Sequence, residues 1–439
     1  MKRAIKLRIA FLFILFLNSF LLSKDKSIFE QRRQNILNSM PRNSLLILAS
    51  TPECYRFGFS FHQDSDLFYL TGELRDGVAL ILSSSPIELV NSALAAKSFL
   101  VFTHHPQEGN NNEYNQPLTN KDNGEVAISL RKFRKILNKI DKLDVLFTNL
   151  KSKKKKFSSI FWGNRLNKLV GQFPDVKIKA AEELTTPFRR VKSQDEIELM
   201  QNAIDVTIEA QKEAMRSMKP GVFEHQIEAV IEFVFKYNGC EHLAFPSIVG
   251  AGPNSLNLHY NEGERKIASG DMVVIDVGCE YQHYCADITR TIPASGKFTS
   301  AQKKVYNAVL EANKAVIDAL KPGMTFADMD EIVKTVFLKY GFEKFIRHSC
   351  SHRLGLDVHD VGSRNAPFKP GCVVTVEPGI YIPENSDLPK EYWDIGVRIE
   401  DDVLITENGH QLLSEKLTKT IEGIEQLMAE TGMIDKIQK

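Results

Sequence analysis

Two stretches decide the fold of the second half of the chain: Met272-Val-Val-Ile-Asp-Val-Gly278 and, shortly after it, Ala286-Asp-Ile-Thr-Arg290. The first is an apolar strand with Asp276 near its end, and Asp287 in the second lies eleven residues further along the chain. Two strands joined by a turn would bring these carboxylates to one place. Acidic residues are mostly exposed, so this pair alone is a weak indication of a site.

Three later segments strengthen that indication. His348-Ser-Cys-Ser-His352 leads to His359-Asp360, which puts three histidines within twelve residues of a chain that contains only eleven. Glu377 follows the apolar run Cys372–Val376, and Arg398-Ile-Glu-Asp-Asp402 opens another apolar run. Each of these polar residues therefore lies on or beside a predicted strand that could point it into a shared cleft.

The candidate metal ligands form an oxygen-rich set with one imidazole: Asp276, Asp287, His352, Glu377 and Glu400. Such a set suits two hard or borderline divalent ions bridged by carboxylates. Buried carboxylates without a partner would be very costly, and metal ions are the simplest compensation. An ion-pair network with Arg290 and Arg398 is the alternative that these residues leave open.

The chain length of 439 residues predicts two domains. Short apolar runs that alternate with polar and helical stretches indicate an α/β domain over residues 24–187. A larger domain over residues 188–439 begins with the capped helix start Ser193-Gln-Asp-Glu196. It contains two helix pairs, at 195–218 with 224–237 and at 301–320 with 326–340, and Pro220-Gly221 and Pro322-Gly323 each follow a helix and end it. The repeated arrangement predicts a duplicated half.

The first 23 residues have the layout of a signal peptide. Lys2, Arg3, Lys6 and Arg8 precede an apolar run from Ile9 to Leu22, which is shorter than a membrane-spanning helix requires. We therefore expect export to the periplasm or the medium after cleavage, without stable membrane insertion. A cytoplasmic protein is the alternative.

The six cysteines show neither a C-x-x-C pair nor zinc-finger spacing, so they predict no metal cluster. An even number permits disulfides in an exported protein. Cys279, Cys285 and Cys372 nevertheless lie in apolar strand-like runs, where a buried free thiol is commoner.

The charge is nearly balanced, with 56 Lys and Arg against 55 Asp and Glu, which favours a small, roughly neutral substrate over nucleic acid. The lysine-rich tract at 151–156 is predicted to be a solvated loop, since it lacks aromatic platforms and a broad basic face. The chain contains no dinucleotide-binding, P-loop or serine-hydrolase motif.

Several ordered motifs together resemble the proline aminopeptidases, also called aminopeptidase P, of metallopeptidase family M24. The first half has Gln63-Asp-Ser-Asp-Leu-Phe-Tyr-Leu-Thr-Gly72, which looks like the signature of that family's N-terminal domain. The second half adds Leu258-His-Tyr260 to the histidine and carboxylate segments quoted above. The resemblance spans nearly the whole chain after residue 23. It implies an α/β (α+β) protein in which an N-terminal α/β domain precedes a catalytic domain with the pita-bread fold of creatinase and methionine aminopeptidase.

The resemblance also implies roles for the residues. Asp276 and Asp287 would hold one ion, His352 and Glu377 would join Asp287 on the other, and Glu400 would bridge both. The ions would be two divalent metals, with manganese expected. Of the implied catalytic residues, Glu377 is the general base and Arg398 orients the bridging carboxylates, while the histidines that line the site are His259, His348 and His359.

The activity implied is removal of the N-terminal residue from peptides with proline at position two, by an enzyme that forms a dimer or tetramer. A prolidase restricted to X-Pro dipeptides shares the ligands and is the nearest alternative. A non-catalytic pita-bread binding protein is an alternative of another class. Cys350 and Arg353 depart from residues that family members often carry, which predicts a different pocket rim.

Overall fold

The computed structural model describes residues 26–50, 55–56, 60–88, 95–102, 118–120, 125–153, 156–157 and 162–437. The predicted signal peptide, residues 1–23, lies outside the described residues. The chain divides into two compact units between Thr186 and Pro187. Within the described residues, no helix is both long and apolar enough to cross a membrane.

The first unit is built on a mixed sheet with helices, which agrees with the predicted α/β domain. Buried apolar side chains of this sheet pack with Phe133 and Trp162 of the helices. The order of the seven strands is β11 (Lys177–Ala180), β8 (Val145–Thr148), β1 (Ser44–Ala49), β4 (Val78–Glu88), β5 (Ala95–Phe102), β7 (Glu125–Ser129) and β6 (Leu118–Asn120). The helices are α2 (Lys26–Ser39), α3 (Ser65–Thr71), α4 (Leu130–Leu137), α5 (Trp162–Gln172) and α6 (Glu182–Arg189), the last of which reaches into the second unit.

The family signature in the first unit forms a short capped helix. The Asp64 side chain accepts a hydrogen bond from the Leu67 backbone N–H at the start of α3. The helix ends at Gly72, whose φ of 66° is left-handed and suits glycine. Asp64 and Gly72 of this motif therefore begin and end the helix.

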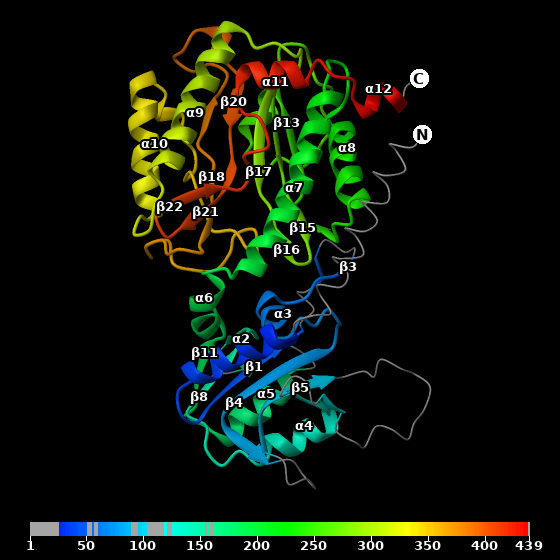
Figure 1. Ribbon diagram of the computed structural model, residues 1–439, viewed down its shortest axis with the longest axis vertical. Helices are drawn as coiled ribbons and strands as arrows, with labels where there is room; N and C mark the ends of the chain where they lie inside the picture. The colour runs from blue at the N-terminus through cyan, green and yellow to red at the C-terminus, as the bar shows by residue number, and fades with distance from the viewer. Residues whose placement is uncertain are drawn as a thin grey trace. The chain divides into compact units, whose positions relative to one another are not determined.

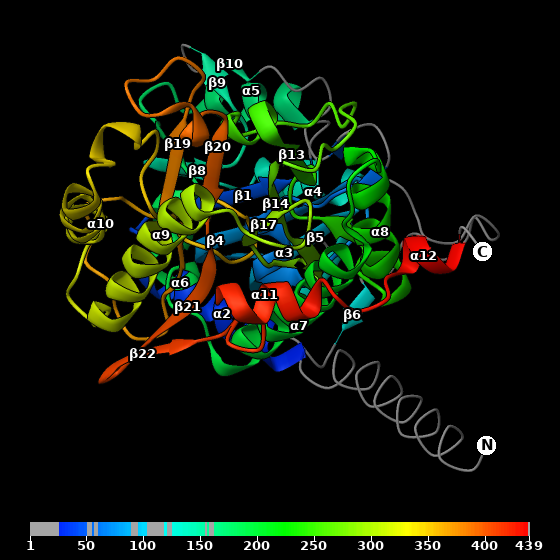
Figure 2. The ribbon, with the colours of Figure 1, turned by 90° about the horizontal axis from the view of Figure 1, so that it is seen from above.

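The second unit confirms the predicted duplication. Its helix pairs are α7 (Gln194–Ser217) with α8 (Glu224–Tyr237) and α9 (Ser300–Ala319) with α10 (Phe326–Tyr340). Within each pair, a glycine with φ of 95° (Gly221) or 93° (Gly323) lies in the connection. Both views of the molecule show the strands of this unit between the two helix pairs (Figures 1 and 2).

The strands of the second unit are antiparallel and form four small sheets. They are β13 (Ile248–Ala251), β14 (Met272–Val277) and β17 (Ile288–Pro293); β12 (His242–Leu243), β15 (Cys279–Tyr281) and β16 (Tyr284–Cys285); β18 (Val373–Val376), β21 (Asp401–Thr406) and β22 (Gly409–Leu412); and β19 (Gly379–Ile382) with β20 (Ile395–Arg398). This alternation of helix pairs and sheets agrees with the domain that the resemblance implied.

Gly278 connects β14 to β15 at a point with no room for a side chain. A Cβ atom there would overlap the carbonyl oxygen of Ala286, which precedes Asp287. We predict that Gly278→Ala lowers the free energy of unfolding by about 1–3 kcal/mol, as overpacking of a well-packed core does. Gly270→Ala is the control, because an added Cβ there meets no atom within 4 Å. Thermal unfolding measures both, and equal midpoints for the two variants would contradict the steric argument.

Candidate metal centre

One cavity of about 400 Å³ in the second unit gathers the residues that the sequence singled out. Both the candidate metal ligands and the candidate catalytic residues line it: His259, Asp276, Asp287, His348, His352, His359, Glu377, Arg398 and Glu400. These residues come from segments up to 141 positions apart, from His259 to Glu400. The cavity therefore depends on the tertiary fold rather than on any one motif.

The antiparallel sheet of β13, β14 and β17 places the first two carboxylates. Asp276 of β14 lies opposite Thr289 of β17, and Val277 lies opposite Ile288. Asp287 directly precedes β17, so it lies at the end of the ladder next to Asp276. Both carboxylates are buried. The prediction that a turn between two strands brings them together is correct.

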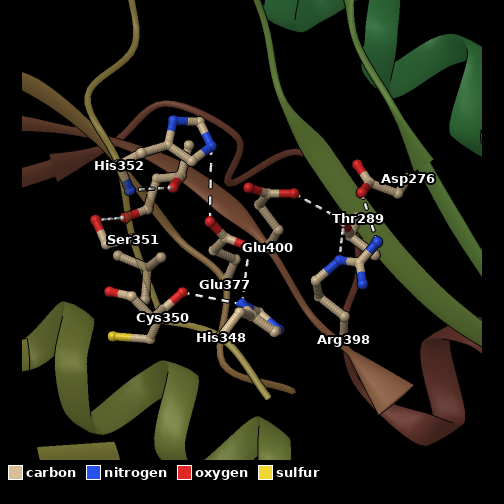
Figure 3. Close-up of polar contacts among 12 residues, drawn as sticks. Asp276, Thr289, His348, Cys350, Ser351, His352, Glu377, Arg398 and Glu400 are labelled. Carbon is tan, nitrogen blue, oxygen red and sulfur yellow. Dashed lines mark hydrogen bonds and ion pairs between the residues drawn. The ribbon is translucent and has the colours of Figure 1, made fainter. Parts of the chain in front are cut away.

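The other acidic candidates approach from the later sheets. Glu400, between β20 and β21, is buried, and its backbone N–H donates to the Thr289 carbonyl at 3.0 Å. Glu377 follows β18, and its N–H donates to the Cys350 carbonyl at 2.8 Å. In Figure 3 the Glu377 carboxylate lies between His352 and His348. Its Oε1 is 3.6 Å from His352 Nε2, and its Oε2 is 3.6 Å from His348 Nδ1.

His352 presents one nitrogen to the carboxylates. Its Nδ1 lies 3.0 Å from the Arg353 carbonyl, which can only accept a hydrogen bond. This contact keeps the proton on Nδ1 and leaves the lone pair of Nε2 free for a metal. Nε2 is 3.3 Å from Asp287 Oδ2. Ligand atoms of Asp287, His352 and Glu400 all lie within 4.8 Å of one another, which is close enough for one ion.

Arg398 begins a directed chain of hydrogen bonds on one wall of the cavity. Its Nη1 donates to the Tyr381 hydroxyl at 2.7 Å, and that hydroxyl lies 2.7 Å from His348 Nε2. His348 Nδ1 lies 2.9 Å from the Ser349 carbonyl and donates to it. Tyr381 must therefore donate to Nε2 of a neutral His348. Burial lowers the pKa of His348 to about 4, which agrees with this protonation state.

Arg398 was expected to orient the bridging carboxylates Asp287 and Glu400, but its direct carboxylate contact is with Asp276. Its Nη2 donates to Asp276 Oδ2 at 2.5 Å. It reaches Glu400 only through Thr289, whose hydroxyl accepts from Arg398 Nε at 3.2 Å and donates to Glu400 Oε2 at 2.7 Å. We gave Thr289 no role from the sequence. Alternation along a strand puts it on the same face as Asp287, which was the available signal.

The loop that carries His259 is fixed by a buried glutamate that the sequence analysis also missed. Glu224, at the start of α8, is fully buried and accepts hydrogen bonds from the Tyr260 hydroxyl at 2.7 Å and from the Arg265 N–H at 2.9 Å. It also accepts from the Ala251 N–H at 2.8 Å. No motif marks Glu224, because its partners lie 27 to 41 residues away.

His359 lies close to the ligand histidine. The ring centroids of His352 and His359 are 4.3 Å apart at 61°. Burial, with the neighbouring His352 and His259, lowers the pKa of His359 to about 4. A neutral ring keeps one N–H available as a hydrogen-bond donor at neutral pH.

The four carboxylates are too crowded to be neutralised by protein groups alone. Burial first, and then repulsion from neighbouring carboxylates, raise the pKa of Asp287 and of Glu400 well above their ordinary values. Burial likewise raises the pKa of Glu377 to about 7. Among the described residues, Arg398 is the one arginine or lysine that forms an ion pair with any of the four. The ion-pair network considered as an alternative is therefore insufficient, since Arg290 pairs with Asp401 instead.

Unsatisfied oxygens within the cavity fit divalent ions. Asp276 Oδ1 and Asp287 Oδ1 are buried without a hydrogen-bond partner. Such atoms are costly unless a cation or a donor meets them. With four carboxylates and the Nε2 atom of His352, the donor set matches hard or borderline divalent metals.

The two departures at the rim have different surroundings. Cys350 is buried, and its N–H donates to Asp330 Oδ1 at 2.8 Å. The Arg353 guanidinium stacks against Phe326 and Phe368, and Nη2 donates to the Ser363 and Ala366 carbonyls at 3.0 Å. Arg353 thereby fixes the loop that follows His359.

Comparisons with known proteins match both units. Residues 198–407 match metallopeptidase family M24, and residues 29–108 match the aminopeptidase P N-terminal domain. The Xaa-Pro aminopeptidase of Haemophilus influenzae is 35% identical over 92% of this chain and 97% of its own length. The Escherichia coli Xaa-Pro aminopeptidase is 32% identical over 91% of this chain and 97% of its own.

Solved structures agree with these sequence matches. Aminopeptidase PepP of Pseudomonas aeruginosa superposes with a TM-score of 0.80 at 31% identity, covering 92% of this chain and 98% of that chain. An Xaa-Pro dipeptidase of Pyrococcus horikoshii is 37% identical, but over only 56% of this chain and 67% of its own.

The crowding of the carboxylates predicts how the stability of the metal-free protein depends on pH. Because the pKa values of Asp287, Glu377 and Glu400 are raised, the folded protein holds protons that the unfolded chain releases above about pH 4.5. This contribution to stability is complete below that pH and is lost as the pH rises, for Glu377 through about 7 and for Asp287 and Glu400 well above their ordinary pKa values. His348 and His359, whose pKa values are lowered to about 4, have the opposite effect below about pH 6.5, where the unfolded chain protonates them. Chelator-treated protein should therefore unfold at a lower temperature at pH 8.5 than at pH 7, and added divalent metal should remove the difference.

Substitution distinguishes this effect from other titrations. Asp287→Asn removes one crowded carboxylate and should reduce the pH dependence of the metal-free protein, whereas exposed Asp318→Asn should leave it unchanged. A metal-free protein that becomes more stable between pH 7 and pH 8.5 would show that the carboxylates are not crowded as described.

Proposed function

Because the chain belongs to the aminopeptidase P group of metallopeptidase family M24, we propose that it removes the N-terminal residue from peptides whose second residue is proline. The observation that carries this proposal is the complete set of four carboxylates and one histidine facing a cavity that three further histidines line. The proposed partners are peptides with an X-Pro N-terminus and further copies of this chain in a dimer or tetramer.

Two divalent ions, with manganese as the proposed metal, would occupy the carboxylate end of the cavity. Asp276 and Asp287 would hold one ion, His352, Glu377 and Asp287 the other, and Glu400 both. When bound, the ions would lower the pKa of a shared water toward neutrality and polarise the peptide carbonyl. Manganese is supported by the excess of oxygen donors over the single imidazole.

Glu377 is the proposed proton carrier. Its carboxylate lies in the cavity, with Oε1 3.6 Å from His352 Nε2 and Oε2 3.6 Å from His348 Nδ1, where it could accept a proton from a water and release it again. It would take the proton from the attacking water and pass it to the proline nitrogen as the peptide bond breaks. The proline nitrogen must gain a proton to leave as a secondary amine, so the leaving group requires such a donor.

His359 and His259 are the proposed donors to the developing oxyanion. A neutral imidazole N–H can donate a hydrogen bond to the carbonyl oxygen as its charge grows. Arg398, Tyr381 and His348 would hold the opposite wall rigid through their hydrogen-bond chain. His348 would also present its ring to the proline.

Substituting the proton carrier tests its role. Glu377→Gln should lower kcat by about a thousandfold, within the range for loss of a general acid–base group. Exposed Glu384→Gln makes the same chemical change seven residues away and should leave kcat unaltered. Metal content should be measured for each variant, because Glu377 is also a proposed ligand. A Glu377→Gln enzyme that keeps its metals and most of its kcat would contradict the assignment.

Specificity is tested with two tripeptides and one dipeptide. The manganese-loaded enzyme should release alanine rapidly from Ala-Pro-Ala and slowly or not at all from Ala-Ala-Ala, as mass spectrometry would show. Cleavage of Ala-Pro without cleavage of the tripeptide would identify a prolidase. Absence of cleavage in every metal-loaded form would favour a binding protein. The same assay with zinc in place of manganese tests the choice of metal.

We also propose that the protein is exported, on the basis of Lys2, Arg3, Lys6 and Arg8 before the apolar run Ile9–Leu22. N-terminal sequencing of protein isolated from its native cells should find a start shortly after Leu22. An intact Met1 on protein from the cytoplasmic fraction would contradict export.

A further inference from the structure

Two cysteine thiols lie unusually close together beside the strand that carries Asp276. The Sγ atoms of Cys240 and Cys279 are 2.8 Å apart, although both cysteines are free in this structure. A disulfide bond has an S–S distance of about 2.05 Å. A movement of less than one ångström would therefore join them.

Backbone contacts hold both cysteines in place. The Cys240 N–H donates to the Phe235 carbonyl at 3.2 Å, which ties it to the end of α8. The segment after it pairs with β15, where His242 lies opposite Glu280 and Leu243 opposite Cys279. The Glu241 N–H also donates to the Glu280 carbonyl at 3.2 Å. The proximity of the two thiols is thus set by the strand pairing.

Cys279 is connected to the metal ligands through its main chain. The Cys279 carbonyl accepts a hydrogen bond from the Ala286 N–H at 3.1 Å, and Ala286 directly precedes Asp287. Cys279 itself follows Asp276 by three residues. Its own N–H donates to the Thr207 hydroxyl of α7 at 3.2 Å. A cross-link at Cys279 would therefore brace the turn that holds both carboxylates.

We propose that Cys240 and Cys279 form a disulfide bond when the protein meets a thiol–disulfide oxidant, and that this bond stabilises the turn between Asp276 and Asp287. The bond would close a loop between residues 39 positions apart. Closing such a loop restricts the unfolded chain and stabilises the folded one.

An external disulfide can oxidise Cys240 and Cys279 by thiol–disulfide exchange. Cys240 is partly exposed and Cys279 is buried, and burial raises the pKa of the Cys279 thiol, so Cys240 reacts first. Its thiolate attacks one sulfur of the external disulfide and releases one thiolate. The Cys279 sulfur then attacks Cys240 Sγ and releases the second. Two protein thiols are oxidised, one external disulfide is reduced to two thiols, and the released thiolates take up the two protons.

The experiment treats the full-length protein with oxidised glutathione and digests it without reduction. Mass spectrometry should find the Cys240 and Cys279 peptides linked, and dithiothreitol should separate them. The thermal midpoint of the oxidised protein should exceed that of the reduced protein by about 5–10 °C.

Two variants make the test specific. Cys240→Ser should fold, because the side chain is only partly buried, and should lose the dependence of the midpoint on oxidation. Cys372→Ser changes a buried thiol that directly precedes β18, and this variant should retain the dependence of the midpoint on oxidation. Free Cys240, a lasting glutathione adduct on it, or a link to another cysteine would overturn the disulfide. A Cys240–Cys279 link without a change in midpoint would overturn the stabilising role.

Discussion

The structure of the second unit depends on holding four carboxylates close together in a buried cavity. Like charges in such surroundings repel strongly and lose the hydration that water would provide. Arg398 offsets part of this cost through Asp276, and Thr289 extends its hydrogen bonding to Glu400. The remaining crowding, with unpaired oxygens on Asp276 and Asp287, suits the cavity to divalent cations.

The surrounding architecture supplies the rigidity that this arrangement requires. The carboxylates lie at the ends of short antiparallel strands, and two helix pairs flank those strands. Gly278 allows the Ala286 backbone to approach the strand of Asp276, and Glu224 fixes the loop of His259 from the start of a helix. Repelling carboxylates stay this close only where the surrounding backbone and packing restrict the conformations of their side chains.

The sequence predicted the parts of the site that depend on local pattern or on a motif. Helix ends were accurate to one residue where Pro-Gly or a capping box marks them, as at Ser193. The pairing of Asp276 with Asp287 followed from two strands and a turn. Individual hydrogen bonds between residues far apart in the sequence were not predicted. Arg398 was expected to orient the bridging carboxylates Asp287 and Glu400; it bonds directly to Asp276 and reaches Glu400 through Thr289. Neither Glu224 nor the Cys240–Cys279 pair carries a local signal, because strand pairing and loop packing create those contacts.

The central claim is that the carboxylate crowding creates a site for two divalent ions shared by Asp287 and Glu400. Anomalous X-ray diffraction from crystals of the manganese-loaded protein measures this most directly. We expect two peaks in the cavity, one beside Asp276 and one beside His352 and Glu377, with Asp287 and Glu400 in contact with both. A single peak, or peaks that do not contact Glu400, would contradict this account.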